Sequence, residues 1–590
     1  MTIKVGEVIS VSGIKVTLRI DEDSSRETMF FNGEKYKGVS IREFLSIQRG
    51  FRNIVCIVEG EYLDESRVDT VDGKVSYIRK VDARPIGYFE NNKFFEGIKF
   101  LPMIKDPAAL LPEGDIVAIF SRGVQSDFVI GKMLKEDIPI SLPWHKLFNS
   151  HMGIFGNTGS GKSNTLTKIF TVLFEKKSAV MVGKSKFIFL DFNGEYTGNQ
   201  FVDAAQKTIM NLVSLNDPVD QFPLSDSEFW DADTFSILFQ ATPNTQKPFL
   251  SRLVTGRRRF LDRPNSLHNY VKSIFRKIFS AASPKAETLE LALRIAALIG
   301  SQPLAALLST VNYNRQTASF FIAPRSYFGA DGATYDEHLL PLVNAIDLGQ
   351  LDSFDELILR AHLQLCRDLI AGYVQFEYIQ PLLKRIEASL TNLRKVLTVE
   401  NAPAEERLLT VISMRRCHSD VKKILPLLIA KHFYNAHKRD AENPPTRTIH
   451  LVIDEAHNIL SQQSAREHES WRDYRLDLFE EIIKEGRKFG VFLTVSSQRP
   501  ADISPTVISQ LHNFFIHRLV NDRDLFLINN TISTLDNVSK GMIPTLGRGA
   551  CVVTGTAFDI PMVLQINMLE RERQPDSEDV DLQRIWANDQ

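Results

Sequence analysis

An eight-residue segment of this chain has the residue types and spacing needed to bind phosphate groups. Residues 156–163 read Gly-Asn-Thr-Gly-Ser-Gly-Lys-Ser, which fits the pattern Gly-x4-Gly-Lys-Ser/Thr. The apolar run Met152–Phe155 predicts a strand before the segment, and Asn164–Phe174 predicts a helix after it. Glycines let successive backbone N–H groups turn toward a phosphate, and the helix N-terminus adds partial positive charge there. This context favours a phosphate-binding loop over a Gly-rich turn that holds no ligand.

The residues of this loop have separate expected roles. Lys162 reaches the β- and γ-phosphates of ATP, and the Ser163 hydroxyl coordinates Mg²⁺. We expect nucleotide contacts from the whole loop: Gly156, Asn157, Thr158, Gly159, Ser160, Gly161, Lys162, Ser163 and Asn164. The sequence therefore predicts ATP and Mg²⁺ as cofactors.

A second motif, His450–His457, reads His-Leu-Val-Ile-Asp-Glu-Ala-His. An apolar strand that ends in two acids places them at the carboxyl edge of a parallel sheet, where ligands bind. Asp454 is expected to hold Mg²⁺ together with Ser163, and Glu455 to polarise the attacking water. An acidic turn after a buried strand is common, so this motif indicates a nucleotide site only in combination with the phosphate loop. The long separation of the two motifs predicts that the segment between them is an insertion.

A third acidic strand end leaves two interpretations open. Asp191-Phe-Asn-Gly-Glu-Tyr196 follows the apolar run Phe187–Leu190 directly. In one, the same sheet edge places Asp191 or Glu195 beside the nucleotide; in the other, the segment is a capped turn built on Asn193 and Gly194.

Two further residues complete the expected catalytic set of Lys162, Glu455, Arg487 and Gln498. Gln498 follows the predicted strand Val491–Ser496, so its amide can sense a γ-phosphate at the strand end. Arg487 lies at the corner before that strand and can insert into a neighbouring subunit as an arginine finger. The alternative for Arg487 is a surface ion pair with Glu480 or Glu481.

The elements that must position these residues predict an α/β fold in several parts. Residues 1–140 alternate apolar and polar positions in short runs, Asp115–Phe120 among them, which predicts a small N-terminal β-barrel or sandwich. Continuous apolar runs followed by helical patterns predict a doubly wound core over residues 141–200 and 440–566. Residues 201–439 are helical and form the insertion, a β-hairpin is expected over 549–566, and residues 567–590 form a charged tail that is mobile or arm-like.

Composition sets limits on partners and compartment. The 590 residues carry a formal net charge of −2, so any nucleic-acid contact must come from a local basic surface. Four scattered cysteines read as reduced thiols, and neither a leader nor an apolar run long enough to span a membrane is expected. We therefore expect a cytoplasmic protein without membrane contact.

Taken in order, these motifs resemble the HerA group within the HerA/FtsK branch of P-loop ATPases. The matching text is Gly-Asn-Thr-Gly-Ser-Gly-Lys-Ser-Asn-Thr-Leu, Asp-Phe-Asn-Gly-Glu-Tyr, Val-Ile-Asp-Glu-Ala-His, Glu-Gly-Arg-Lys-Phe-Gly and Ser-Gln-Arg-Pro. The barrel and the β-rich C-terminal end are also similar to HerA, whereas the helical insertion matches only in position and type. Two departures stand out: the family often has His at the position of Asn193 and a basic residue at that of Ser150.

The resemblance implies a RecA-like ATPase core, a HAS-barrel-like N-terminal domain and a homohexameric ring that moves duplex DNA through its centre. It supports Arg487 as a finger acting in trans and Gln498 as a sensor. It also implies a partner on the barrel side, either a nuclease or, in antiviral systems, a sirtuin-like NADase. Two functions follow: a DNA translocase or helicase that powers the partner, and a ring-shaped scaffold that assembles and activates it.

Two basic clusters are candidates for DNA contact. Arg257–Arg259 and Arg415–Arg416 can contact phosphates from a pore, or can be solvated surface. Aromatic and basic residues do not alternate as they do in single-strand stacking platforms, so the sequence favours tracking of a duplex backbone.

Overall fold

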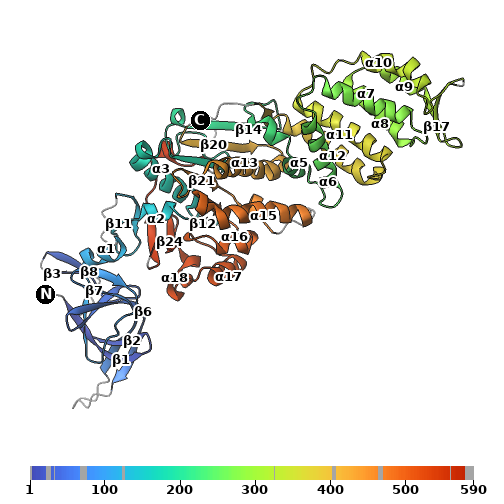
Figure 1. The fold of residues 1–590 in the computed structure, drawn as a ribbon. Helices are drawn as coiled ribbons and strands as arrows, with labels where there is room; N and C mark the ends of the chain where they lie inside the picture. The colour runs from blue at the N-terminus through green and yellow to red at the C-terminus, as the bar shows by residue number, and fades with distance from the viewer. Residues whose placement is uncertain are drawn as a thin grey trace.

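The computed structural model describes residues 3–21, 28–31, 33–66, 76–121, 127–324, 326–400, 407–462, 469–558, 560–577 and 586. These residues form an elongated molecule with a β-barrel at one end, an α/β core in the middle and a helical region at the far end (Figure 1). The α/β class predicted from the sequence, with a barrel, an ATPase-like core, a helical insertion and a β-rich C-terminal end, is confirmed.

Six antiparallel strands form the barrel. Their order is β2-β1-β9-β5-β6-β7, and the sheet closes because β2 also pairs with β7, with Val16 opposite Ala83. Inward-facing residues such as Val8, Leu18 and Val81 are fully buried, which is the period-2 pattern that the sequence showed. The barrel strands and the short strands beside them are β1 (Lys4–Ser12), β2 (Lys15–Ile20), β3 (Thr28–Phe31), β4 (Glu34–Lys37), β5 (Phe44–Arg49), β6 (Arg52–Ser66), β7 (Ser76–Glu90), β8 (Lys93–Glu96) and β9 (Pro107–Leu110).

The prediction of a strand over Asp115–Phe120 is wrong. Residues Glu113–Ser121 form helix α1, which buries Ile116, Ile119 and Phe120 at helical spacing. Two acids in the first turn, Glu113 and Asp115, favour a helix because they complement its dipole. A short apolar run alone does not distinguish a strand from a helix.

The core is built on one sheet of eleven strands in the order β11-β10-β25-β24-β23-β12-β22-β21-β13-β20-β14. From β23 to β14 neighbouring strands are parallel, whereas β24, β25, β10 and β11 extend the sheet in antiparallel pairings. The strands are β10 (Val129–Met133), β11 (Pro139–Ser141), β12 (Met152–Phe155), β13 (Ser185–Asp191), β14 (Thr208–Val213), β20 (Leu409–Arg416), β21 (Thr448–Ile453), β22 (Val491–Ser497), β23 (Asn513–Ile516), β24 (Ala550–Gly555) and β25 (Met562–Ile566).

Two features of this sheet bear on the site. Strand β22 lies between β12 and β21, so the phosphate loop and the acidic strand end are one strand apart at the same carboxyl edge. The sheet also includes β10 and β11, which precede residue 142, and β14 and β20, which flank the insertion. The core therefore takes in residues that we expected in the barrel and in the insertion.

Helices cover both faces of this sheet (Figure 1). They are α3 (Lys162–Met181), α13 (Ser419–Asp440), α14 (His457–Leu460), α15 (Glu469–Glu485), α16 (Pro505–Ser509), α17 (Asp522–Thr531) and α18 (Asn537–Met542), with α2 (Trp144–Phe148) at the entrance to β12. None of the helices in the described ranges combines the length and apolar character that a bilayer crossing requires. All four cysteines are buried and unpaired, as expected.

The helical region leaves the core after β14 and returns at β20. Its helices are α4 (Asp226–Phe229), α5 (Ala232–Phe239), α6 (Gln246–Arg259), α7 (Ser266–Phe279), α8 (Glu287–Ile299), α9 (Gln302–Thr310), α10 (Leu340–Asn344), α11 (Ser353–Ile370) and α12 (Phe376–Leu393). The helical pattern over Leu289–Leu307 is two helices, because Gly300 caps α8 in the left-handed conformation at φ 70°.

The C-terminal end forms the predicted hairpin of β24 and β25. The tail beyond it was expected to be mobile or arm-like, and its described part, residues 568–577, packs on the core. Arg573 forms an ion pair with Glu175 on α3 at 2.6 Å, and the backbone N–H of Asp576 donates to the Glu195 carbonyl at 2.9 Å. The remaining tail residues lie outside the described ranges, apart from Trp586.

Candidate active site

The phosphate loop lies where the sequence predicts it, between the end of β12 and the start of α3. Gly159 and Gly161 have φ values of 74° and 105°, which other residues rarely adopt. A Cβ on Gly161 would lie 2.8 Å from the Gly549 Cα, and one on Gly156 would lie 2.5 Å from the His517 Cβ. Backbone conformation and close packing therefore require glycine at these positions.

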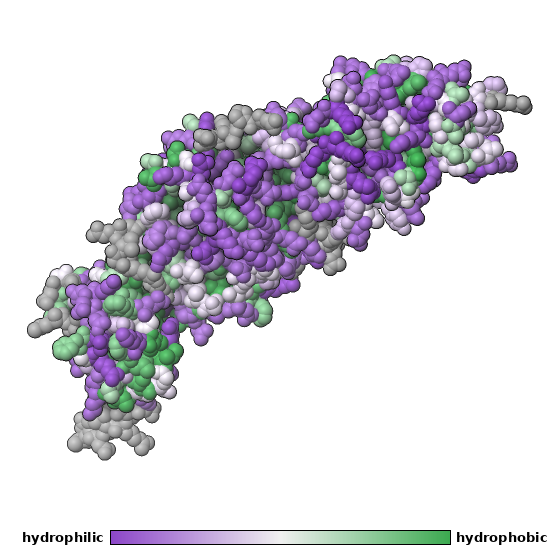
Figure 2. All heavy atoms as spheres, in the orientation of Figure 1, coloured by the Kyte–Doolittle hydropathy of each residue, from purple (hydrophilic) through white to green (hydrophobic). Residues whose placement is uncertain are grey.

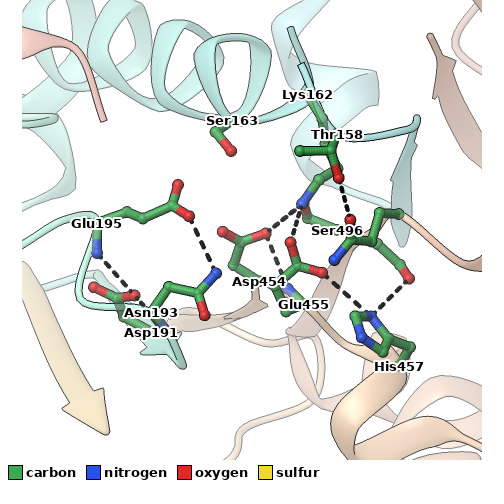
Figure 3. A network of polar contacts seen from close by, with 12 residues as sticks. Thr158, Lys162, Ser163, Asp191, Asn193, Glu195, Asp454, Glu455, His457 and Ser496 are labelled. Atoms are coloured by element: carbon green, nitrogen blue, oxygen red, sulfur yellow. Dashed lines mark hydrogen bonds and ion pairs between the residues drawn. The ribbon is translucent and has the colours of Figure 1, made fainter. Parts of the chain in front are cut away.

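Lys162 is buried and held by three oxygen atoms. Its Nζ donates to Asp454 Oδ1 at 3.0 Å, Glu455 Oε1 at 3.1 Å and Ser496 Oγ at 3.2 Å (Figure 3). Burial by itself lowers the pKa of Lys162, but the charges of Asp454 and Glu455 outweigh burial and raise it. Lys162 is therefore a full cation at the point where the loop and the acidic strand end meet.

Asp454 and Glu455 lie directly after β21, as predicted. Tyr196 Oη donates to Asp454 Oδ2 at 2.7 Å, and Ser496 Oγ donates to Asp454 Oδ1 at 2.6 Å. Burial raises the pKa of Asp454, but Lys162 and these hydrogen bonds outweigh it and lower the pKa. Asp454 is therefore an anion despite being 3% exposed.

Glu455 has an unusual backbone conformation. Its φ of 48° lies in the left-handed region, where a non-glycine residue is strained, and strain of this kind is concentrated at functional sites. His457 Nδ1 lies 3.2 Å from Glu455 Oε2. Burial raises the pKa of Glu455, but the hydrogen bond from His457 and the charge of Lys162 lower it overall. The ionised carboxylate can accept a proton from water, as a general base must.

Gln498 is brought to the phosphate loop. It follows β22, and its Oε1 accepts a hydrogen bond from Thr158 Oγ1 at 2.6 Å. This contact links the end of β22 to the phosphate loop. The arrangement agrees with the sensor role expected for Gln498.

Both interpretations of the third acidic strand end describe the structure in part. Asp191 caps a turn, accepting the backbone N–H groups of Gly194 at 2.7 Å and Tyr196 at 3.0 Å. Glu195 instead points toward Ser163 and Asp454 (Figure 3). Its Oε2 is buried and accepts no hydrogen bond from the described residues, and burial with the nearby Asp454 charge raises its pKa to about 7.

The two asparagines at the ends of the loop contact neighbouring backbone. Asn157 Oδ1 accepts from the Val520 N–H at 3.3 Å. Asn164 Oδ1 accepts from the Leu569 N–H at 3.3 Å, and its Nδ2 donates to the Asn567 carbonyl at 3.3 Å. Both side chains therefore hold adjoining segments against the loop.

Arg487 lies at the opposite edge of the sheet from the phosphate loop. It precedes β22, whereas the loop follows β12, and these two strands are parallel. Its side chain is exposed and lies 3.1 Å from His512 Nε2, with no carboxylate partner among the described residues. The ion pair with Glu480 or Glu481 is absent from the described contacts: Glu480 pairs with Lys484 and Glu481 with Lys438.

Sequence reasoning missed several residues that complete the site. Ser496 joins Lys162 to Asp454, Tyr196 holds Asp454, and His457 holds Glu455. Ser496 ends the predicted strand that precedes Gln498, and Tyr196 ends the segment that begins at Asp191, so their place next to these motifs was the available signal. The fully buried His517 lies against Gly156 and gave no such signal.

The donor set fits a magnesium ion. Mg²⁺ takes oxygen ligands and usually binds through one or two carboxylates together with phosphates and water. The Ser163 hydroxyl, the Asp454 carboxylate and the unsatisfied Glu195 Oε2 face one another across the space below α3 (Figure 3). The described residues contain no cluster of three or more His, Cys, Asp or Glu side chains that would bind a metal without such help.

The chain is similar in sequence to HerA proteins. Residues 128–300 match the family described as "Helicase HerA, central domain". Over 481 residues the chain is 22% identical to the DNA double-strand break repair helicase HerA of Sulfurisphaera tokodaii, an alignment that covers 80% of this chain and 74% of that protein. HerA of Pyrococcus furiosus is 33% identical over 118 residues, 20% of each chain.

Solved structures also align with it. VirB4 of Thermoanaerobacter pseudethanolicus aligns at a TM-score of 0.44 and 13% identity, covering 76% of this chain and 98% of that one. The bacterial conjugative coupling protein TrwB aligns at 0.40 and 11%, covering 79% and 94%. The predicted resemblance to HerA is confirmed by the sequence matches, and together with the loop geometry they identify the chain as a P-loop ATPase.

Proposed function

We propose that this HerA-type ATPase uses ATP hydrolysis to move along duplex DNA as a ring of identical subunits. The observation that carries the proposal is the placement of the catalytic groups on two opposite edges of one sheet. Lys162, Asp454 and Glu455 meet at the carboxyl edge, whereas the exposed Arg487 lies at the amino edge. An arginine so far from its own loop can complete a site only in a neighbouring subunit.

The hydrolytic mechanism follows from the residues at the carboxyl edge. Lys162 and the loop N–H groups hold the phosphates, and Ser163 and Asp454 would hold a Mg²⁺ ion, which would supply positive charge to offset that of the phosphates. Glu455 accepts a proton from the attacking water, while His457 fixes the carboxylate. Gln498, held by Thr158, reports the state of the terminal phosphate to the end of β22.

DNA contact is best supported at the carboxyl edge as well. Arg415 and Arg416 end β20 and are exposed, and Arg415 lies against the turn at Gly194 beside Glu195. Phosphate contacts from these arginines would lie close to the nucleotide. Arg257 is unsuited to this role because it is paired with Asp226 and Glu356.

The barrel is the proposed docking domain for a partner nuclease or NADase. Several of its apolar side chains are exposed, and exposed apolar side chains that form one contiguous patch are typical of an interaction site. The exposed side chains include Phe51, Ile98, Leu101, Met103 and Ile104. A role in antiviral defence in the cytoplasm would follow from an NADase partner.

The test is the ATPase rate measured with and without duplex DNA of increasing length. We expect duplex DNA to raise turnover and longer duplexes to raise it further, with Glu455→Gln inactive throughout. A rate that does not respond to DNA, but that rises when the partner binds, would replace the translocase by the scaffold that activates an effector. Light scattering of the ATP-bound protein checks the subunit number.

A further inference from the structure

The helical region contains a basic groove that the ATPase site does not use. It lies between α6, α7 and α11, in the helical region at the end of the molecule farthest from the barrel (Figure 1). It encloses a cavity of about 570 Å³. This volume falls in the range of small-molecule sites. The surface over these helices is strongly hydrophilic in Figure 2.

The floor of the groove is a buried chain of polar side chains. Tyr270 Oη donates to Gln364 Oε1 at 3.2 Å, and Gln364 Nε2 donates to Asp368 Oδ1 at 2.7 Å. Arg252 closes the chain with two hydrogen bonds to Asp368 Oδ2, at 3.0 and 2.8 Å. Gln364 and Asp368 are 3% and 0% exposed, so the floor is a fixed structure.

The rim carries positive charge that nothing on the described chain neutralises. Arg259, Arg263, Lys277 and Arg367 line the groove and are exposed, and none of them has a carboxylate partner among the described residues. Asp368 is the only acid among the residues lining the groove, and Arg252 already neutralises it. Four unpaired cations around one cavity favour a ligand with several negative charges.

Two other arginines that line the groove do have carboxylate partners, so unpaired charge is not general among the cations of the groove. Arg257 is paired with Asp226 and Glu356, and Arg360 is paired with Glu356. Both side chains are less than half exposed and serve the packing of α6 on α11. Among the cations that line the groove, the exposed ones at its mouth are therefore the ones without a carboxylate partner in the described residues.

Aromatic side chains stand beside these cations. Phe260 and Tyr373 line the groove and are 39% and 69% exposed. The guanidinium groups of Arg263 and Arg259 lie 5.1 and 5.7 Å from the centre of the Phe260 ring. Exposed rings next to arginines provide a surface on which a base can stack while its phosphate is held.

We propose that this groove binds a nucleoside phosphate, with the phosphates held by the arginine rim and the base stacked on Phe260 or Tyr373. The ligand can come from a free nucleotide or from an unpaired nucleic-acid strand, because both present the same chemistry. The site is separate from the phosphate loop and does not depend on the translocase function proposed above.

The test measures binding to the full-length protein by fluorescence anisotropy with two probes. One is a labelled single-stranded oligonucleotide, and the other is labelled ADP, used in the Lys162→Ala background to weaken the phosphate-loop site. The variants are Arg259→Ala/Arg263→Ala and, separately, Ser273→Glu, which adds negative charge to the groove. Arg258→Ala is the matched control, because Arg258 is exposed on the same helix but does not line the groove.

We expect the dissociation constant of at least one probe to rise about tenfold or more in both groove variants, and to change less than about twofold in Arg258→Ala. The probe that responds identifies the source of the ligand. Wild-type affinity for both probes in both groove variants would overturn the proposal, as would an equal loss in the control or no binding of either probe to the unaltered groove. Basal ATP hydrolysis, measured in parallel without the Lys162 change, should be unaltered, which separates this result from any failure of the ATPase site.

Discussion

The Nζ of Lys162 lies 3.0 Å from the Oδ1 of Asp454, although 292 residues separate them along the chain. The contact is possible because the helical region leaves the sheet after β14 and returns at β20. The strands β12 and β21 therefore stay one strand apart in the sheet. Lys162 thus pairs with the buried carboxylates of Asp454 and Glu455, and in the proposed function it also contacts the phosphates of a bound nucleotide.

Replacing Lys162 by alanine should abolish ATP hydrolysis. The change removes the cation that contacts the phosphates and leaves Asp454 and Glu455 buried without their counter-charge. We expect turnover to fall by at least about 10²-fold, measured as phosphate release. Lys168→Ala on the same helix is the control, and near-normal turnover in Lys162→Ala would reject the assignment of the loop.

Replacing Glu455 by glutamine should separate nucleotide binding from hydrolysis. The amide keeps the size of the side chain but cannot take a proton from water, so turnover should fall by about 10²–10⁴-fold while ATP still binds. Binding of a fluorescent ATP analogue and phosphate release are measured on the same samples.

Glu195→Gln is the matched variant for this experiment, because Glu195 is the other carboxylate that faces the site. A larger loss of turnover in Glu195→Gln than in Glu455→Gln would assign the base to Glu195.

Replacing Arg487 by alanine should inactivate the protein in a way that mixing can repair. Arg487→Ala subunits keep an intact phosphate loop, and Lys162→Ala subunits keep the arginine. A mixed ring therefore contains some complete sites if Arg487 acts in trans. We expect each variant alone to be inactive and mixtures to regain measurable turnover.

Lys488→Ala, an exposed neighbour, controls for loss of surface charge. If no mixing ratio restores turnover, the site is not shared through Arg487.

Stability should fall below neutral pH because of buried neutral histidines. Burial lowers the pKa of His450 and of His151 to about 3, and that of His517 to about 4. In the unfolded chain histidine has a pKa of about 6.5, so that state binds protons first as the pH falls. Above pH 6.5 these histidines do not make the free energy of unfolding depend on pH. Between pH 6.5 and its folded-state pKa, each histidine lowers the free energy of unfolding by about 1.4 kcal/mol for every unit by which the pH falls.

His450→Phe tests this effect. The ring lies stacked against Phe187 and Phe492, with centroid distances of 4.4 and 5.2 Å, so a phenyl ring fits the same space. We expect the melting temperature of the variant to fall less between pH 7.5 and 5 than that of the unaltered protein. The exposed His145→Gln should leave the dependence unchanged. Identical pH dependence in His450→Phe would show that His450 does not contribute.

Part of this site could be read directly from contiguous motifs. The glycines of the phosphate loop and the acids at the end of β21 were predicted because each motif is local: a few neighbouring residues set both the backbone path and the chemistry. The same holds for β12 and for the C-terminal hairpin. The helix at Glu113–Ser121 was missed because a short apolar run carries too few turns to show its period.

The sequence by itself determined that the chain has a P-loop, two acids at the end of a buried strand, and an α/β core interrupted by a helical insertion. The tertiary structure decided which side chains meet. It placed Ser496 between Lys162 and Asp454, Thr158 against Gln498, and Arg487 on the far edge of the sheet. The physical reason is strand order: β22 lies between β12 and β21, and no local pattern in the chain encodes which strands become neighbours.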